Sequence, residues 1–254
     1  QNYVGFDTES VPDAPWISKE PGPATVQLST MESSLIVHLS HCRNGKVPPA
    51  LVELLHSRDV VKVGVGIDDD MLELYRRLNL VGNCRFDLAG IGSQPDRMTG
   101  LKTLALDLVG VKMCKSKKLA RSDWSLLPLT NKQLAYCARD AWAGAAVMDV
   151  LMQRRPDVFG IEEIMSLVNA QERSMEDIDQ RARSRKQAKI ALKNLLYECK
   201  LRGMEFKGRT EVDDIEAQRS IDYLQDALGV LKPDGIFVFD PVKLELFDDS
   251  YASS

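Results

Sequence analysis

Two carboxylates, Asp7 and Glu9, stand at the end of the apolar run that begins at Tyr3, whose composition is typical of a buried strand. Side chains on a strand repeat every second residue, so both acids share one face, with Cα atoms about 6.6 Å apart. Like charges held so close repel each other, and a bound Mg²⁺ or Mn²⁺ would offset that repulsion. These residues alone leave open a strand end in solvent, where both acids are hydrated.

A second pair of residues that could take part in a reaction is Tyr136 and Asp140. Both lie in a segment predicted to be a helix from Asn131 to Arg154. Residues four apart on a helix stack on one face, about 6 Å apart. Thr130 is the expected N-cap, and a proline at position 156 marks the end. Taken alone, the pair is also compatible with a polar helix surface.

A third group of acids, Asp68 to Asp70, opens a predicted helix that runs through Leu78. It directly follows a short apolar strand, Val60 to Val65, and Gly66. Acids in a first turn interact favourably with the helix dipole, so plain capping explains Asp68 and Asp69.

The remaining helices and strands are predicted from the periodicity of hydrophobic residues and from the Gly and Pro residues that interrupt it. A loop with four prolines over residues 10–23 separates the first strand from the next. Further strands are expected at 24–30, 34–39 and 84–88, and further helices at 50–57, 101–108, 161–206 (with a break near 183–184) and 213–228. Two short strands or an ordered tail are expected at 236–240 and 244–247. Strands followed by a strand and helix alternation indicate an α/β fold, a mixed sheet flanked by helices.

The character of the chain changes near residue 160, so we expect two domains, 1–158 and a mainly helical extension, 159–254. Two basic stretches without acids, 112–121 and 181–193, flank this change. A solvated surface is the default interpretation of such stretches, and attraction of a phosphate backbone is the alternative.

Composition narrows the class of protein. The 254 residues are 44% hydrophobic and 28% charged, with a net charge of −4, which is typical of a globular protein. No apolar stretch is long enough to span a membrane. Five widely spaced cysteines without a C-x-x-C pair predict a reducing, intracellular compartment. The chain begins at Gln1 without a signal-peptide pattern, which leaves open that it is a piece of a longer protein whose targeting segment is missing.

Taken together, these motifs resemble the DEDDy group of 3′-5′ exonucleases, which includes RNase D and the exonuclease domain of Werner-type helicases. Asp7-Thr8-Glu9 is similar to the first motif, Val63 to Ile67 with Asp70 to the second, and Tyr136 with Asp140 to the third. The segment 122–130, Ser-Asp-Trp-Ser-Leu-Leu-Pro-Leu-Thr, is similar to the family's linking segment. The related DEDDh group would have a histidine where this chain has Ala135. The resemblance covers about residues 3–152, and it departs at Ser10, where the family often has an aromatic residue.

The resemblance implies a ribonuclease H-like fold with a five- or six-stranded sheet. It also implies two divalent cations, Mg²⁺ or Mn²⁺, that offset charge during hydrolysis of a phosphodiester. The metal ligands would be Asp7, Glu9, Asp70 and Asp140, and Tyr136 would orient the attacking water. The implied substrate contacts are Thr8, Lys117, Lys118, Arg121 and Trp124. For Trp124, stacking on a base and packing in the core both remain open.

The expected activity is release of nucleoside monophosphates from the 3′ end of a single strand or overhang, RNA or DNA. A non-catalytic nucleic-acid-binding or scaffold module on the same fold is the alternative from a different class, and a related nuclease that cuts internally is a third. The presence of all four carboxylates and Tyr136 favours the exonuclease.

Overall fold

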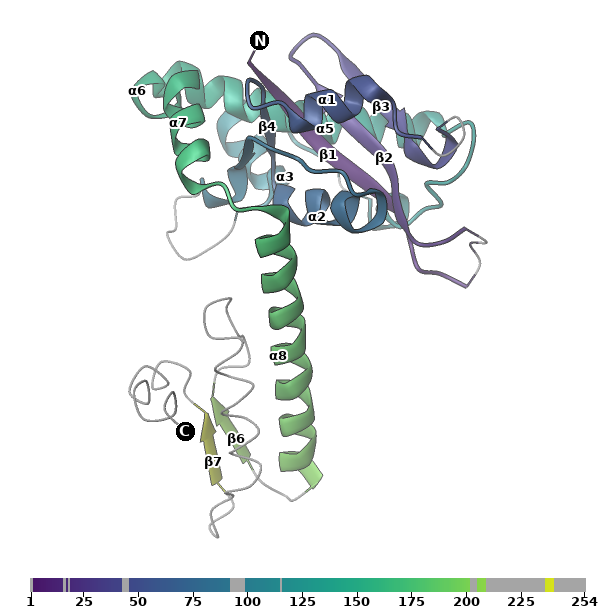
Figure 1. Cartoon of the computed structure of the whole chain (residues 1–254), viewed down its shortest axis with the longest axis vertical. Helices are drawn as coiled ribbons and strands as arrows, with labels where there is room; N and C mark the ends of the chain where they lie inside the picture. The colour runs from purple at the N-terminus through teal and green to yellow at the C-terminus, as the bar shows by residue number, and fades with distance from the viewer. Residues whose placement is uncertain are drawn as a thin grey trace. The chain divides into compact units, whose positions relative to one another are not determined.

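The apolar run at the start of the chain forms β1, the central strand of a mixed sheet (Figure 1). The computed structural model describes residues 2–15, 17, 19–42, 46–91, 99–114, 116–201, 205–208 and 236–239. The strands of this sheet are β1 (Tyr3–Val11), β2 (Gly22–Ser29), β3 (Ser34–His38), β4 (Val61–Gly64) and β5 (Arg85–Asp87). Their order is β3-β2-β1-β4-β5. β1 pairs antiparallel with β2 and parallel with β4, so the predicted mixed sheet is confirmed with five strands.

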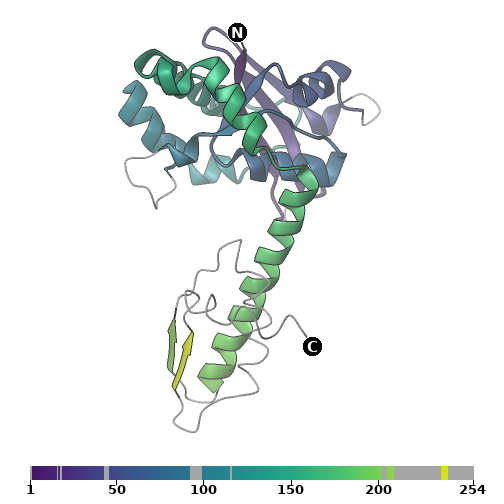
Figure 2. The ribbon, with the colours of Figure 1, turned by 60° about the vertical axis from the view of Figure 1, so that its left-hand side comes forward.

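Helices cover both faces of the sheet (Figures 1 and 2). The longer ones are α1 (Pro49–His56), α2 (Ile67–Leu78), α5 (Asn131–Arg154), α7 (Ile161–Gln171) and α8 (Met175–Leu201). The shorter segments are η1 (Leu39–His41), η3 (Leu88–Gly90), α3 (Leu101–Leu104), the π-helical η4 (Ala105–Val109), α4 (Lys117–Ala120) and α6 (Pro156–Phe159). In the part of the chain that the structure describes, no helix combines the length and apolarity needed to cross a bilayer.

The two faces of β1 meet different helices. Gly5 faces α5 so closely that a Cβ there would overlap the Ala141 carbonyl oxygen and lie 2.8 Å from the Ala145 nitrogen. Gly144 also brings α5 close to β4, because a Cβ there would lie 3.1 Å from the Val63 oxygen. The odd-numbered side chains of β1 therefore share their face with α5, and the even-numbered ones point to the opposite face.

The first of two compact units of the chain ends at Met175. α7 packs Ile164 and Val168 into the same cluster as Met148 and Leu151 of α5 and Val63 of β4. The sequence change near residue 160 therefore lies inside this unit, and the structure divides the chain after Met175 rather than near 158. An amphipathic helix that supplies core residues to the sheet layer belongs to that layer.

The predicted helix 161–206 is interrupted earlier than expected. The break lies at residues 172–174, between α7 and α8, and the expected break near 183–184 is wrong because α8 runs through it. Glu172 explains the position, since its carboxylate accepts from the Cys84 nitrogen at 2.5 Å and pairs with Arg85 and Arg58. Ending α7 there places this carboxylate at the start of β5.

The second unit, 176–254, contains most of α8 and a two-stranded parallel sheet. Its strands are β6 (Glu205–Gly208) and β7 (Ile236–Phe239), with Glu205 opposite Ile236. Extending the helix to residue 206 was wrong, because residues 205–208 pair with a segment distant in sequence. The strand expected at 236–240 forms over 236–239, whereas the predicted helix 213–228 and strand 244–247 lie outside the described residues.

Candidate active site

The first pair of carboxylates lies at the carboxyl end of β1. Asp7 is opposite Gln27 and Glu9 is opposite Thr25 on the antiparallel neighbour β2. A register shift between Glu9 and Ser10 then ends the regular pairing. Asp7 and Glu9 share the odd-numbered face of β1, which is the face that α5 covers.

Helix α5 runs antiparallel to β1 and carries Tyr136 and Asp140 to these acids. The Tyr3 hydroxyl donates to Asp149 Oδ1 at 3.2 Å near the start of β1, and Gly5 contacts Ala141. From Tyr3 to Glu9 the strand advances about 20 Å. From Asp149 back to Tyr136 the helix advances almost the same distance, about 20 Å. The two pairs expected from the sequence therefore meet at one end of the strand.

The start of α5 is fixed by a capping box. The Gln133 nitrogen donates to Thr130 Oγ1 at 3.3 Å, and the Thr130 nitrogen donates to Gln133 Oε1 at 3.0 Å. The Gln133 side-chain amide also donates to Ser122 Oγ and to the Asp123 carbonyl, at 3.2 and 2.9 Å. These bonds join the linking segment to the first turn of the helix and so set the positions of the residues one turn later.

The charges of three carboxylates act on the Tyr136 hydroxyl. Burial is the largest cause that raises the pKa of this hydroxyl, and the negative charges of Asp140, Glu9 and Asp7 follow. A hydrogen bond from the Tyr136 hydroxyl to Asp140 acts in the same direction. Both residues are buried, with 5% of Tyr136 and 3% of Asp140 exposed. Arg139 is the positive group nearby, with Nε 3.6 Å from Asp140 Oδ1 and its guanidinium 5.4 Å from the Tyr136 ring centre.

Asp70 reaches the same strand through Thr8. Gly66 precedes α2 in the left-handed conformation (φ 75°), and Asp70 follows in the first turn. Thr8 Oγ1 donates to Asp70 Oδ1 at 2.6 Å. Burial raises the pKa of Asp70 to about 7, aided by the charges of Asp69 and Asp87 and opposed by the bond from Thr8.

The structure therefore brings Asp7, Glu9, Tyr136 and Asp140 to the same end of β1. It places Asp70 against Thr8, the residue between Asp7 and Glu9 in the sequence. Among the described residues, no three side chains of His, Cys, Asp or Glu stand in an arrangement that holds a metal ion. One oxygen of Asp70 accepts a hydrogen bond from Thr8, whose side chain points to the face of β1 opposite Asp7 and Glu9.

Other acids near α2 support the structure. Asp68 lies in the first turn of α2 as expected, but it pairs with Arg85 Nε at 2.8 Å, and the N-cap of this helix has no side-chain hydrogen bond. Asp87, at the end of β5, accepts from the Gly66 nitrogen at 3.1 Å and from the Ala89 nitrogen at 2.8 Å. Sequence reasoning missed Asp87, although its place at the end of a strand parallel to β4 was a usable signal.

The expected substrate contacts divide into two groups. Lys117, Lys118 and Arg121 are exposed on and directly after α4, where phosphates can reach them. Trp124 is fully buried, its Nε1 donates to the Ala120 carbonyl at 3.2 Å, and its ring lies 6.0 Å from that of Tyr136. The expectation that Trp124 contacts substrate is therefore wrong, because neither face of its ring is open to a base.

Two histidines, His38 and His41, contact the linking segment. Nε2 of His38 donates to the Trp124 carbonyl at 2.9 Å, and Nε2 of His41 donates to the Ser125 carbonyl at 2.7 Å. His38 is the last residue of β3, and His41 is the last residue of η1. Nothing in the local sequence indicated these contacts, since they join positions more than eighty residues apart.

Comparison with known proteins finds relatives among 3′-5′ exonucleases. A family model described as 3′-5′ exonuclease matches residues 1–154. A 3′-5′ exonuclease from Arabidopsis thaliana is 30% identical over 152 residues, which are 59% of this chain and 52% of that protein. The bifunctional 3′-5′ exonuclease/ATP-dependent helicase WRN from Mus musculus is 28% identical over 179 residues, 67% of this chain and 12% of that protein. The chain thus spans about half the length of the first relative and a small part of the second.

Solved structures confirm the ribonuclease H-like fold. Escherichia coli RNase D aligns with a TM-score of 0.52 at 17% identity, over 78% of this chain and 50% of that chain. NrnC from Brucella melitensis aligns with a TM-score of 0.52 at 24% identity, over 66% of this chain and 80% of that chain. Because the family model described as 3′-5′ exonuclease matches the chain from β1 to the end of α5, the chain belongs to the 3′-5′ exonuclease family.

Proposed function

We propose that this chain is a metal-dependent exonuclease that removes single nucleotides from the 3′ end of a nucleic acid strand and releases nucleoside monophosphates. The observation that carries the proposal is the buried Tyr136 hydroxyl, which bonds to Asp140 and lies in the field of Asp7 and Glu9. Family membership and the relatives named 3′-5′ exonuclease support it.

The donor set at the end of β1 fits hard divalent cations. Asp7, Glu9 and Asp140 offer carboxylate oxygens, which suit Mg²⁺ and Mn²⁺. A structure of NrnC from Brucella melitensis has bound Mg²⁺. We propose that these three acids hold one cation and that Asp70 contributes to a second. Two such ions would neutralise charge on the attacking and leaving oxygens.

The protein side chains would perform the other tasks. Tyr136 would orient the attacking water through its hydroxyl, which the buried ring and Asp140 hold in place. Thr8 would hold Asp70 against β1, which makes Thr8 a positioning residue. The cations of Lys117, Lys118 and Arg121 would attract the substrate backbone through phosphate contacts that carry no sequence information.

The proposed substrate is a single-stranded end or a 3′ overhang, of RNA or DNA. Among the structural neighbours, NrnC has been solved bound to pGG and RNase D from Trypanosoma brucei in complex with RNA U12. Parallel degradation assays on labelled RNA and DNA, single-stranded and with a 3′ overhang, determine the preference.

The decisive experiment compares the wild-type chain with Asp7→Asn on a 5′-labelled oligonucleotide in Mg²⁺ or Mn²⁺. We expect a ladder of products shortened from the 3′ end, loss of the ladder in EDTA, and a rate at least about 10³-fold lower in the variant, because a charge-stabilising group is lost. Asp13→Asn removes the same charge from an exposed loop residue and should retain the wild-type rate. Wild-type cutting by Asp7→Asn would refute the proposal.

One observation favours the alternative of a non-catalytic binding module: Asp70 bonds to Thr8 on the face of β1 opposite Asp7 and Glu9. Calorimetric titration with Mn²⁺ separates the two functions. A nuclease should take up Mn²⁺ in a manner that Asp7→Asn weakens, whereas a degraded site should show no uptake that depends on this acid. A circular single-stranded substrate excludes internal cutting if it stays intact.

A further inference from the structure

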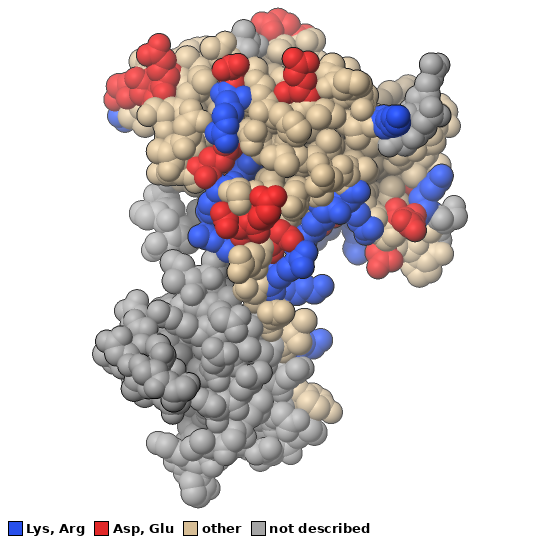
Figure 3. Space-filling view, in the orientation of Figure 1, with Lys and Arg blue, Asp and Glu red and all other residues tan. Residues whose placement is uncertain are grey.

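Helix α8 carries a face on which lysines alternate with exposed apolar side chains. Lys186, Lys189 and Lys193 are exposed, as are Ile190 (51%) and Tyr197 (61%). Their spacings of three, four and seven residues place all five on one side of the helix, along about 16 Å of its length. We call these five residues the basic face of α8. Figure 3 shows Lys and Arg side chains gathered along the described part of this helix.

The positive charge of this region is concentrated although the whole chain is acidic. Residues 180–197 contain six Lys and Arg residues and no Asp or Glu, in a chain of net charge −4. Arg183, one turn before Lys186, pairs with Asp179 at 2.7 Å. Such a stretch raises the local concentration of anions against the repulsive field of the rest of the molecule.

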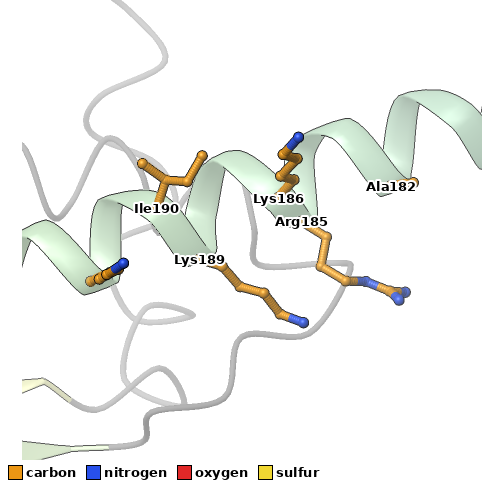
Figure 4. A pocket seen from close by; sticks show the side chains of 6 residues that line it. Ala182, Arg185, Lys186, Lys189 and Ile190 are labelled. Atoms are coloured by element: carbon orange, nitrogen blue, oxygen red, sulfur yellow. The ribbon is translucent and has the colours of Figure 1, made fainter. Parts of the chain in front are cut away.

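The surface between the lysines is hollowed. Lys186, Lys189, Ile190 and Lys193 line, with Ala182 and Arg185, a hollow of about 390 Å³ (Figure 4). A hollow lined by cations around an apolar floor fits a phosphodiester backbone together with the edge of a sugar or base.

From these observations we infer that the basic face of α8 binds the phosphate backbone of single-stranded nucleic acid, with one base stacked on Tyr197. Three lysines supply contacts that depend on salt and not on sequence. An exposed aromatic ring next to them is the usual platform for an unpaired base. The choice of nucleic acid as partner rests on the proposed nuclease function, and the placement of charge and ring rests on α8 alone.

The arrangement fits a nucleic acid better than a membrane surface. A helix that lies in a bilayer interface gathers its apolar residues into one continuous stripe with the charges on the other side. On α8, Lys193 lies between Ile190 and Tyr197 on the same face, so inserting these two residues into lipid would bury a charged lysine.

The test measures binding of the full chain to a fluorescein-labelled thymidylate homopolymer by anisotropy, in EDTA so that metal-dependent cleavage does not occur. The triple variant Lys186→Gln/Lys189→Gln/Lys193→Gln should weaken binding at least about tenfold at low salt. It should also make the salt slope of log K shallower by about 2, since each lost contact to a single strand contributes about 0.7. Glutamine keeps helix propensity close to that of lysine, and circular dichroism checks that α8 remains folded.

A matched control removes the same charge elsewhere. Lys19, Lys46 and Lys102 are exposed lysines of the first unit, and changing all three to Gln gives the same net charge as the α8 variant. Affinity and salt slope should stay within about twofold of wild type in this control. Equal weakening by both triple variants would show attraction by net charge alone and would overturn the inference.

Tyr197 provides an independent readout. Tyr197→Ala should weaken binding of the single strand about tenfold, whereas Tyr197→Phe should not, because stacking needs the ring and not the hydroxyl. Neither change should affect a blunt duplex, whose bases are already stacked. If the α8 variants bind the homopolymer like wild type but lose binding to vesicles of anionic phospholipid, the face is a membrane surface and the inference fails. Because these binding measurements need no hydrolysis, they stand even if the proposed nuclease activity fails.

Discussion

The ring and the hydroxyl of Tyr136 have separate roles, so a single substitution can isolate the chemistry. The ring packs in a cluster with Trp124 and Val11, which accounts for its burial. The hydroxyl bonds to Asp140 and faces the charges of Glu9 and Asp7. Removing the oxygen alone therefore preserves the packing and takes away the group that would orient water.

We predict that Tyr136→Phe lowers kcat by about 10²-fold with little change in KM, because a positioned proton-transfer group contributes on the order of 10² or more. The variant should unfold within a few degrees of the wild-type Tm, since the phenyl ring fills the same space. Steady-state kinetics on a 5′-labelled oligonucleotide, with a thermal melt of the same sample, measure both quantities.

Tyr3→Phe is the matched control at the other end of α5. It also removes a tyrosine hydroxyl that donates to an aspartate, Asp149, at 3.2 Å. We expect a loss of about 1 kcal/mol in stability and an unchanged kcat. Equal losses of kcat in both variants would mean that Tyr136 acts by holding α5 and not in the reaction.

Which site residues the sequence could predict depended on how local their signal was. Asp7 and Glu9 share a strand, and Tyr136 and Asp140 share a helix turn, so periodicity alone placed each pair on one face. The bond from Thr8 to Asp70 depends on how α2 approaches β1, which no local pattern encodes. Trp124 shows the converse, because a segment with the right motif can still turn its aromatic ring into the core.

The close contact of α5 with β1 determines where the second pair of site residues, Tyr136 and Asp140, lies. Gly5 permits this contact, because any Cβ there would overlap the backbone of Ala141. Backbone atoms of a helix cannot move singly, so α5 would have to shift as a unit. Asp140 directly precedes Ala141 in the same helix and would move with it.

We predict that Gly5→Ala destabilises the chain by about 1 to 3 kcal/mol through overpacking. It should also lower kcat by about 10²-fold among molecules that remain folded, since a displacement near 1 Å can cost that much. Urea unfolding and kinetics below the transition separate the two effects. Gly90→Ala is the control, because no atom lies within 4 Å of a Cβ built there, and it should change neither quantity. An active Gly5→Ala enzyme of wild-type stability would contradict the rigid contact.

The bounds of α5 were predictable because both ends carry local signals, a capping box at Thr130 and a proline at 156. The end of α7 was not, because no glycine or proline marks it. The helix stops where Glu172 meets Cys84, Arg85 and Arg58, which are distant in sequence. Helix ends set by tertiary ion pairs are beyond a local pattern.

For the whole molecule, the sequence predicted the mixed sheet and its helices because strand and helix periods alternate through the first unit. The extent of that unit was less accessible, since α7 joins it through two buried residues, Ile164 and Val168. In the second unit the pairing of β6 with β7 joins segments about thirty residues apart, and short apolar runs do not identify their partners.

A buried lysine links the stability of the first unit to pH. Lys62 of β4 has no exposed surface, and its Nζ donates to the carbonyls of Leu54, Ser57 and Val60 at 3.3, 2.7 and 2.8 Å. Burial lowers its pKa from 10.5 to about 8. Cys84 and Glu172 oppose this shift, whereas Arg85 and Arg58 add to it.

The free energy of unfolding should therefore rise as the pH increases from 8 to 9. In this range the folded chain releases the Lys62 proton while the unfolded chain keeps it, so the unfolded state binds more protons. The slope approaches at most about 1.4 kcal/mol per pH unit. Above pH 9 the Cys84 thiol should lower the free energy of unfolding. Burial raises its pKa in the folded chain, so the thiol ionises first in the unfolded chain. Urea denaturation across pH 7 to 9 should show the rise in wild type and in the exposed-lysine control Lys102→Met, and its absence in Lys62→Met. A rise that persists in Lys62→Met would assign the proton to another group.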